Sequence, residues 1–600
     1  MPQKKTPQKP RIRTEWDLSP LYKSPDDPKI EKDLNEAEKA YSAFAAKYRK
    51  DESYLRDDAT LLRALEDNDK LSELKASHSY MYLSRLKDLD SRKTEIQSKS
   101  SLVLQRLQAI SNSVLFFGVN LSKIPVETQK KFVQSPKLAK YKYFLEKIFE
   151  NSRFVLSEKE EKILSLKYLP SHKLWVDFFS NMHSKQTVKH KGKDITISEA
   201  GQLIADLKTQ KERADLYGKI IEKSKEIAHI AENELNAIVL NKKVEDELRG
   251  HKNAYDATVR AYENDEATVL NIVRTVTDSF PLVHRFFKTK AKMLGVKRLK
   301  YSDRFASIGK TKKKIPFEDG YATLHLLFTR LDPKFGEILK RFAESGQIDA
   351  FPKVGKRGGA YCDGGYKIPT LIFLNYTDNF DSLSTFAHEM GHGIHTELAK
   401  SQPVIYQEYT ISTAEVASTL FENFLFHDEF EKLDEKEKII ALHDRIADSI
   451  GTIFTQIALF NFEVEMHATI RERGRMTEKE LAACMLKHLK ACYGPTFDFE
   501  EKNGYAFVSW PHIRYFFYVY TYAMGLLTSN ALYKKYSEDK SYMQKIKKFM
   551  ELGGSMSPED IFASIGIDIR KADFFKKGID AIESDLSLLE KLVEKSAKKR

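Results

Sequence analysis

The first 117 residues contain no glycine, and through residues 28–112 apolar side chains recur about every 3.6 positions. Glycine supplies the backbone conformations that tight turns need, so its absence favours continuous helices over hairpins. The helical spacing continues through residues 128–183 and returns from residue 199 to about 295. The pattern therefore predicts a mainly α protein built from long amphipathic helices.

Two stretches depart from this pattern. Residues 187–196 alternate apolar and polar side chains around Gly192, which predicts a short hairpin. Residues 346–377 are rich in glycine and then become strongly apolar, which predicts a strand at residues 368–377. We place a domain boundary directly after the hairpin, at residue 198.

The stretch from Phe386 to His395 contains two histidines four positions apart, His388 and His392, with Glu389 between them. On a helix, residues four apart lie on one face, so both imidazoles can bind the same divalent metal ion. From the neighbouring position Glu389 can reach a water molecule that the metal activates and act as its general base. The spacing predicts a site for metal-assisted hydrolysis.

A catalytic zinc site usually has a third protein ligand, and residues 411–422 can supply it. In this helical pattern Glu415 and Glu422 project from one face, which is otherwise apolar. Carboxylates on such a face need partners; a metal would suit Glu415, and a ligating imidazole would suit Glu422. Alternatively, Glu415 closes a capping box with Ser412. We favour the ligand interpretation, because the histidine pair lacks a third ligand.

The net charge of +12 and the isoelectric point near 9.0 raise nucleic acid as a partner. Lysine and glutamate are interleaved along the chain, however, as on solvated helix faces, for example at residues 158–162. The positive charge concentrated at the two ends lacks the aromatic side chains on which bases stack. We therefore expect no nucleic-acid partner.

The sequence also indicates the cellular compartment of the protein. No run reaches 18 uninterrupted apolar residues, and residues 1–13 lack an apolar core, so we expect neither a membrane span nor a secretory signal. The three cysteines, Cys362, Cys484 and Cys492, are an odd number and form no closely spaced pair. This usage fits a reducing compartment and predicts a cytoplasmic protein.

The histidine motif HEMGHGIH and the segment STAEVASTLFE that follows it resemble the oligoendopeptidase F branch of the thimet oligopeptidase family of zinc metallopeptidases. The resemblance covers nearly the whole chain. It includes TEWDLS at 14–19, GKRGGAYC at 355–362, IPTLIFLNY at 368–376, WPHIR at 510–514 and YVYTYAMG at 518–525.

The resemblance implies a large two-lobed, multi-helix metallopeptidase fold, with a small β region beside the HExxH helix and a deep substrate channel. It implies one Zn²⁺ per chain, held by His388, His392 and Glu415. In the family a histidine and a tyrosine near the C-terminus stabilise the oxyanion, and by position these are His512 and Tyr520. The residues that would support the site or touch substrate are His395, Glu422, Tyr515, Tyr518, Tyr522, Gly359 and Ala360.

The predicted activity is hydrolysis of internal bonds in short unstructured peptides, and the strand at residues 368–376 would pair with the extended substrate. One alternative is a carboxypeptidase, in which Arg357 or Arg514 would hold the terminal carboxylate of the substrate. Another is a non-catalytic helical protein that binds peptides. The sequence does not indicate an oligomeric state. The predicted segments are a basic flexible tail at 1–18, an N-terminal helical domain at 19–198, a catalytic domain at 199–590 and a basic C-terminal tail at 591–600.

Overall fold

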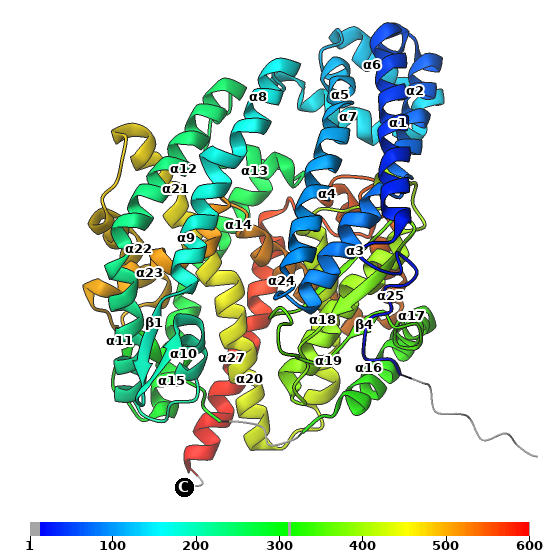
Figure 1. Cartoon of the computed structure of the whole chain (residues 1–600). Coiled ribbons are helices and arrows are strands. Elements are labelled where there is room, and N and C mark those ends of the chain that lie inside the picture. The colour runs from blue at the N-terminus through cyan, green and yellow to red at the C-terminus, as the bar shows by residue number, and fades with distance from the viewer. Residues whose placement is uncertain (1–11, 310–313, 599–600) are drawn as a thin grey trace, which may run out of the picture.

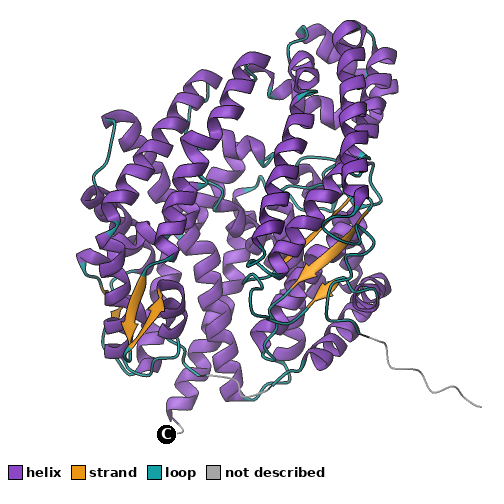
Figure 2. Cartoon of the chain, in the orientation of Figure 1, coloured by secondary structure: helices purple, strands orange, loops and turns teal. Residues whose placement is uncertain are grey.

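The computed structural model describes residues 12–309 and 314–598, and most of them lie in helices (Figures 1 and 2). The prediction of a mainly α fold with a small β region is confirmed. The helices of the N-terminal part are α1 (Pro28–Lys50), α2 (Asp58–Ser72), α3 (Ala76–Leu89), α4 (Thr94–Asn112), α5 (Leu115–Ser122), α6 (Val126–Gln134) and α7 (Lys142–Glu150). The next group comprises α8 (Glu158–Tyr168), α9 (Leu174–Ser184), α10 (Ile197–Ile204), α11 (Gln210–Glu226), α12 (Ala228–Arg249), α13 (Asp256–Ala261), α14 (Glu266–Asp278) and α15 (Phe280–Leu294).

The C-terminal half supplies the remaining helices. They are α16 (Phe317–Leu331), α17 (Pro333–Glu344), α18 (Phe380–Ala399), α19 (Ile411–Phe430), α20 (Glu435–Ser449), α21 (Gln456–Arg473), α22 (Glu478–Tyr493), α23 (Ala506–Ser509), α24 (Tyr520–Glu538), α25 (Met543–Glu551), α26 (Pro558–Ser564) and α27 (Ala572–Lys598). One continuous apolar core runs through this half and includes residues of α9 to α15.

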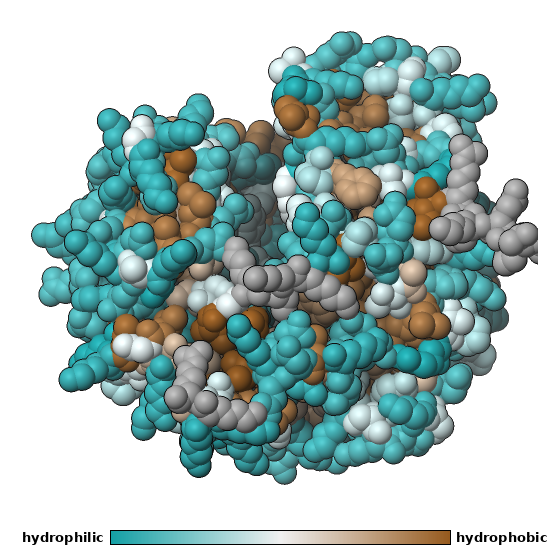
Figure 3. Space-filling view, turned by 90° about the horizontal axis from the view of Figure 1, so that it is seen from below, coloured by the Kyte–Doolittle hydropathy of each residue, from teal (hydrophilic) through white to brown (hydrophobic). Residues whose placement is uncertain are grey.

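Helices α1 to α7 extend from the upper right of Figure 1 towards the centre, and two smaller apolar clusters stabilise them, one of which includes Leu371 from the C-terminal half. Helix α1 shows why the sequence forms such helices. Asp27 caps its first turn by accepting the N–H of Lys29, and Pro28 occupies the first helical position. Leu34 and Phe44 lie on the buried face. Seen from below, the molecular surface is hollowed between two bodies, where the resemblance expects a channel (Figure 3).

The predicted hairpin around Gly192 is present. Strands β1 (Thr187–His190) and β2 (Lys193–Thr196) pair antiparallel, with Thr187 opposite Thr196. Lys191 and Gly192 both have positive φ angles, as a two-residue hairpin turn requires. A second small pairing joins β3 (Leu299–Lys300) to β7 (Phe497–Asp498).

A three-stranded sheet packs against α18. Its order is β4 (Ile348–Asp349), β6 (Ile368–Phe373) and β5 (Tyr361–Gly365). Strand β6 pairs with both neighbours, parallel to β4 at Ile372 and Phe373 and antiparallel to β5 from Ile368 to Phe373. An added strand needs an open edge, so substrate has no access to the edge of residues 368–373 that pairs with β5. In the described sheet the edge beside α18 belongs to β5.

Helices α18 and α19 approach each other very closely. A side chain at Gly391 of α18 would lie 2.7 Å from the Cα of Ser418 and 3.0 Å from the carbonyl oxygen of Ala417, both on α19. On the other side, a side chain at Gly393 would lie 3.0 Å from the ring of Phe342 in α17 and 3.2 Å from Ile372 in β6. The two glycines reduce the intrinsic stability of the helix by about 1 kcal/mol each, and they permit the close approach that positions α18 between the sheet and α19.

The two chain ends are more ordered than predicted. Within the proposed tail at 1–18, the backbone N–H of Asp17 donates to the carbonyl of Gly346 over 2.8 Å. The indole of Trp16 donates to the carbonyl of Ile372 over 2.9 Å. Residues 12–18 thus pack along the sheet, while 1–11 lie outside the described residues. At the other end, residues 591–598 continue α27.

One stretch, Thr94–Ser122, is long and apolar enough in composition to cross a membrane, with a mean hydropathy of 1.3 in its most apolar window. It consists of α4 and α5, which are separated by the turn at residues 113–114. About a quarter of that window (28%) is buried inside the fold. Val103, Ile110, Phe116 and Phe117 belong to the two N-terminal clusters.

Candidate metal centre

Helix α18 brings His388 and His392 together as the spacing predicts. Its first turn is capped by Asn379, whose side chain accepts the N–H of Ser382 over 2.8 Å. The two imidazole rings are one turn apart, with centroids separated by 4.9 Å.

Glu415 faces this histidine pair from α19. Its Oε2 lies 3.6 Å from Nε2 of His388 and 3.8 Å from Nε2 of His392, and the three ligand atoms all lie within 4.8 Å of one another. The alternative capping box is not formed. Ser412 lies inside the helix and donates its hydroxyl to Oδ1 of Asn264 over 2.7 Å, while Thr410 precedes the helix.

Glu422 holds the His388 ring. Nδ1 of His388 donates to Oε1 of Glu422 over 2.5 Å, and the hydroxyl of Ser384 donates to the other carboxylate oxygen over 3.2 Å. This contact directs Nε2 of His388 towards Glu415. Burial lowers the pKa of His388, but Glu422, Glu389 and Glu415 outweigh it and raise the pKa to about 9. The same concentration of negative charge favours a bound cation.

Glu389 lies beside the ligand group without pointing a ligand atom into it. It is 6% exposed, and the backbone N–H of Cys362 in β5 donates to its carboxylate. The other oxygen, Oε2, has no hydrogen-bond partner among the described residues. Burial raises the pKa of Glu389 to about 7, opposed by His388 and aided by Glu415 and Glu422. A general base works best with a pKa near the operating pH.

His388, His392 and Glu415 fit a divalent metal ion such as Zn²⁺. Two imidazole nitrogens and one carboxylate oxygen form the donor set of many catalytic zinc sites. The buried, unpartnered oxygen of Glu389 marks a place where a water molecule would find an acceptor.

The segment that carries His512 is not one helix. Residues Pro511–Arg514 form a 3₁₀ turn, and α24 begins only at Tyr520. Between them Phe516 and Phe517 have φ angles of 55° and 60°, which are strained for residues other than glycine. His512 and Tyr522 therefore lie on two different elements, joined by this turn.

Because the segment is not one helix, the hydroxyl that contacts His512 is that of Tyr518 and not that of Tyr520. Nδ1 of His512 shares a short hydrogen bond with the hydroxyl of Tyr518, and Tyr522 lies against both rings, with centroids 5.8 Å and 5.7 Å away. The structure does not bring Tyr520 to this group, because its hydroxyl donates to Asn264 over 3.0 Å and the residue is completely buried. Tyr515 is largely exposed.

Helix α24 packs against the helix that carries Glu415, and it also carries Tyr522, which contacts His512. Gly525 lies so close to α19 that a side chain there would be 2.7 Å from Cβ of Glu415. Tyr522 stands three residues earlier, and therefore on the same side of α24.

Buried polar groups from distant parts of the chain hold the strained turn. Glu463 of α21 accepts the N–H of Phe517 over 2.8 Å, and Thr258 donates to the carbonyl of Phe516 over 3.0 Å. Arg514 forms a bidentate ion pair with Glu234 of α12. We did not predict these roles from the sequence. The available signal was a carboxylate between apolar neighbours, as at Glu463 between Phe462 and Val464.

The remaining predicted residues take supporting positions. His395 is fully buried and stacks on Tyr409, with ring centroids 3.7 Å apart, and its nitrogens have no hydrogen-bond partner among the described residues. Gly359 has a φ angle of 83°, and its carbonyl accepts from the side-chain amide of Asn375 over 2.7 Å. Ala360 follows it at the entrance to β5.

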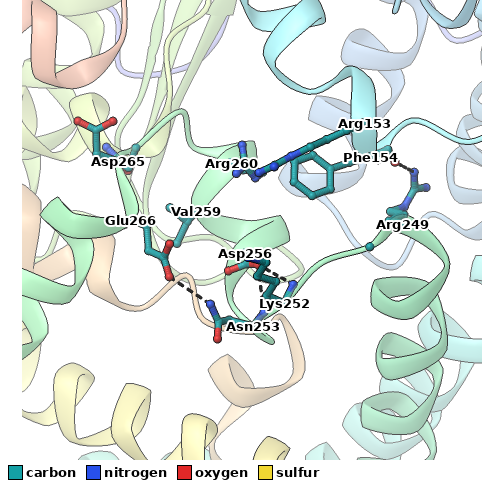
Figure 4. Close-up of a pocket in the computed structure, with 12 residues that line it drawn as sticks. Arg153, Phe154, Arg249, Lys252, Asn253, Asp256, Val259, Arg260, Asp265 and Glu266 are labelled. Atoms are coloured by element: carbon teal, nitrogen blue, oxygen red, sulfur yellow. Dashed lines mark hydrogen bonds between the residues drawn. The ribbon is translucent and has the colours of Figure 1, made fainter. Parts of the chain in front are cut away.

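A cavity of about 380 Å³ lies on another part of the molecule (Figure 4). Its lining includes Arg153, Phe154, Lys252 and Arg260, and none of the candidate metal ligands. It reaches Asn264, which accepts the hydroxyls of Ser412 and Tyr520. The cavity therefore borders the buried support of α19 and α24.

We predict that Glu422→Ala lowers metal affinity by about 10- to 100-fold, because His388 loses the acceptor that orients its ring. The measurement is competition with a chelator of known affinity. Asp428→Ala is the matched control: it removes a carboxylate from the same helix, one that pairs with Arg330 and Lys432. Equal affinities in the two variants would contradict the role of Glu422.

Comparisons with known proteins show the family of this chain. Residues 203–581 match peptidase family M3, and residues 120–185 match oligopeptidase F. An oligoendopeptidase F homolog from Lactococcus lactis is 26% identical over 592 residues, which is 97% of each chain. The oligopeptidase PepF of Bacillus subtilis is 25% identical and covers 89% of this chain and 81% of its own.

Solved structures share the fold. A crystal structure from Chlamydophila abortus covers 98% of this chain and 99% of its own, with a TM-score of 0.81 at 22% identity. That of oligoendopeptidase-F from Enterococcus faecium covers 94% of this chain and 100% of its own, with a TM-score of 0.71 at 18% identity. Since the family match spans more than half of its length, this chain belongs to peptidase family M3 and acts on peptide bonds.

Proposed function

We propose that this protein is a cytoplasmic, zinc-dependent oligoendopeptidase that cleaves internal bonds of short unstructured peptides. The observation that supports it most strongly is the group of His388, His392 and Glu415, with three ligand atoms within 4.8 Å of one another. Beside it stands a buried carboxylate, Glu389, with a free oxygen. When bound, Zn²⁺ supplies Lewis-acid polarisation and lowers the pKa of water.

In this mechanism Glu389 moves the proton. Its pKa of about 7 leaves a large fraction of the carboxylate ionised at neutral pH, ready to take a proton from the attacking water. The protonated acid then delivers that proton to the nitrogen of the leaving amine. The N–H of Cys362 steadies the carboxylate throughout, because it belongs to the backbone of β5.

The oxyanion that forms on the scissile carbonyl needs hydrogen-bond donors. We assign this role to the pair of His512 and Tyr518, in place of the predicted pair of His512 and Tyr520. Burial lowers the pKa of His512, which keeps its imidazole neutral at neutral pH. In the tautomer with its proton on Nδ1, the neutral imidazole donates to the hydroxyl oxygen of Tyr518, which leaves the O–H of Tyr518 free to donate to the oxyanion.

The extended substrate would add to the open edge of β5. The N–H of Cys362 reaches Glu389, so this edge faces the candidate base. Backbone pairing gives affinity with little dependence on side chains, which suits an enzyme for varied peptides.

The carboxypeptidase alternative would need a free cation for the substrate's terminal carboxylate. Arg514 is 2% exposed and fully engaged with Glu234 and the carbonyl of Trp510, so it is not free for that task. Arg357 is largely exposed and lies 3.6 Å from Asp88.

The experiment that tests the proposal uses a peptide of about ten residues, acetylated at one end and amidated at the other. We expect internal fragments by mass spectrometry, loss of cleavage with a chelator, and recovery with Zn²⁺. A carboxypeptidase would leave the amidated peptide intact and shorten a free one stepwise. Binding of the peptide without any cleavage, in protein loaded with metal, would overturn the proposal.

We predict that Tyr518→Phe lowers kcat by about 10²- to 10³-fold, because one oxyanion donor is lost. Tyr520→Phe is the matched control and should change kcat only a few-fold. It loses the buried bond to Asn264 and should be less stable by about 1 kcal/mol. Steady-state kinetics and thermal unfolding of both variants make the comparison. The reverse order of kcat values would restore Tyr520 to the catalytic role.

A further inference from the structure

A second group of metal-ligating side chains lies between α21 and α22. Glu465 of α21 and Cys484 and His488 of α22 each offer one ligand atom, and these atoms lie within 4.8 Å of one another. Among the described residues, this group and the one at His388 are the two sets of three or more such side chains that meet this distance. The proposed peptidase mechanism uses none of the three.

Two of the three candidate ligands lie on the same helix. Cys484 and His488 are four residues apart on α22, so both project from one face towards α21. Glu465 reaches across from α21, and its Oε2 lies 2.8 Å from Nε2 of His488. Ligand atoms around tetrahedral zinc stand about 3.3–3.8 Å apart, given bond lengths of about 2.0–2.3 Å. Small side-chain rotations would therefore close the site.

The group is sheltered but reachable. Cys484 is buried, His488 is mostly buried, and the carboxylate of Glu465 is 37% exposed on the solvent side. That side leaves room for a water molecule as the fourth ligand. The ammonium group of Lys487 lies 2.7 Å from the same Oε2 of Glu465, so this carboxylate already pairs with a positive charge. The Lys487 side chain is 64% exposed and can turn away into solvent.

The same three residue types also occur in thiol catalysis, but this arrangement does not suit it. A nucleophilic cysteine needs access to substrate and a depressed pKa. Cys484 is buried, and burial together with Glu465 raises the pKa of its thiol to about 12. A divalent cation changes this balance, because coordination displaces the thiol proton to solvent and leaves a bound thiolate.

We propose that Glu465, Cys484 and His488 form a second metal site, selective for thiolate-binding divalent ions such as Zn²⁺, that joins α21 to α22. A soft sulfur ligand with one imidazole and one carboxylate favours Zn²⁺ over Mg²⁺ or Ca²⁺. Glu465 follows by two residues Glu463, which accepts the N–H of Phe517 in the strained turn.

Cobalt substitution tests the site directly in the full-length protein. A cobalt ion bound by a thiolate shows a sulfur-to-metal charge-transfer band in the near ultraviolet, and the ligands at His388, His392 and Glu415 contain no sulfur. We expect wild type to bind two Co²⁺ per chain and to develop the band with the second. Mg²⁺ should not displace the second ion, whereas Zn²⁺ should.

Cys484→Ser should abolish the band and reduce the stoichiometry to one, without loss of peptidase activity at saturating metal. Cys492→Ser is the matched control, because it removes a buried thiol from the same helix that has no place in the ligand group. His488→Gln gives an independent answer if the serine variant does not fold. One ion per chain and no band in wild type would overturn the proposal, as would a band that survives in both Cys484→Ser and His488→Gln.

Discussion

Glu389→Gln is expected to lower kcat by about 10²- to 10⁴-fold while the bound metal stays in place. This loss corresponds to about 2.7–5.5 kcal/mol in the activation free energy. Glutamine has nearly the same shape and can still accept the N–H of Cys362, so the helix should be undisturbed. Its amide cannot take a proton from water at neutral pH, and this is the function that we assign to Glu389.

The measurement combines cleavage of a quenched fluorescent peptide with elemental analysis of the same protein samples. Glu397→Gln is the matched control, since it changes another largely buried carboxylate of α18, one that pairs with Lys400 and Arg341. It should retain kcat within a few-fold. If Glu389→Gln keeps both metal and full activity, the base lies elsewhere.

The second large effect concerns stability. Glu234→Ala is expected to lower the free energy of unfolding by about 3–5 kcal/mol, because it leaves the guanidinium of Arg514 buried without a counter-charge. Both side chains are almost completely buried, and two nitrogens of Arg514 contact the carboxylate over 2.9 Å. Since Arg514 is two residues from His512, the variant should also lose kcat.

Two further variants make this result interpretable. In the double variant Glu234→Leu with Arg514→Met no charge remains buried, so most of the lost stability should return. Asp177→Ala removes an exposed partner of Lys173 and should cost about 0–1 kcal/mol. Denaturant midpoints of the four proteins give the comparison. A loss in Glu234→Ala no larger than in Asp177→Ala would show that the buried pair contributes little.

Local rules explain the features that the sequence predicted correctly. The meeting of His388 and His392 depends only on the pitch of a helix, and the hairpin at Gly192 depends on alternation and one permissive turn. The close packing at Gly391 follows from the missing side chain itself. The seven-residue spacing of Glu415 and Glu422 placed both on one face, and the need for a third ligand connected that face to the histidines.

The sequence pattern was misleading where a contact with a distant residue overrides the local preference. From His512 to Tyr522 the pattern is helical, yet Glu463 and Thr258 hold the backbone of Phe516 and Phe517 in a left-handed turn. That turn sends Tyr518 to His512 and Tyr520 to Asn264. Asn264 is 256 residues from Tyr520, and no local spacing can indicate such a partner.

The sequence by itself therefore determined the helical class of this protein and the composition of its candidate metal group, because both follow from periodicity within one or two helices. Only the tertiary structure decided which tyrosine joins His512, that Arg514 serves Glu234 rather than substrate, and that β5 rather than β6 is an edge strand of the sheet. These outcomes depend on which distant segments pack together, and packing is fixed by the burial of the whole core.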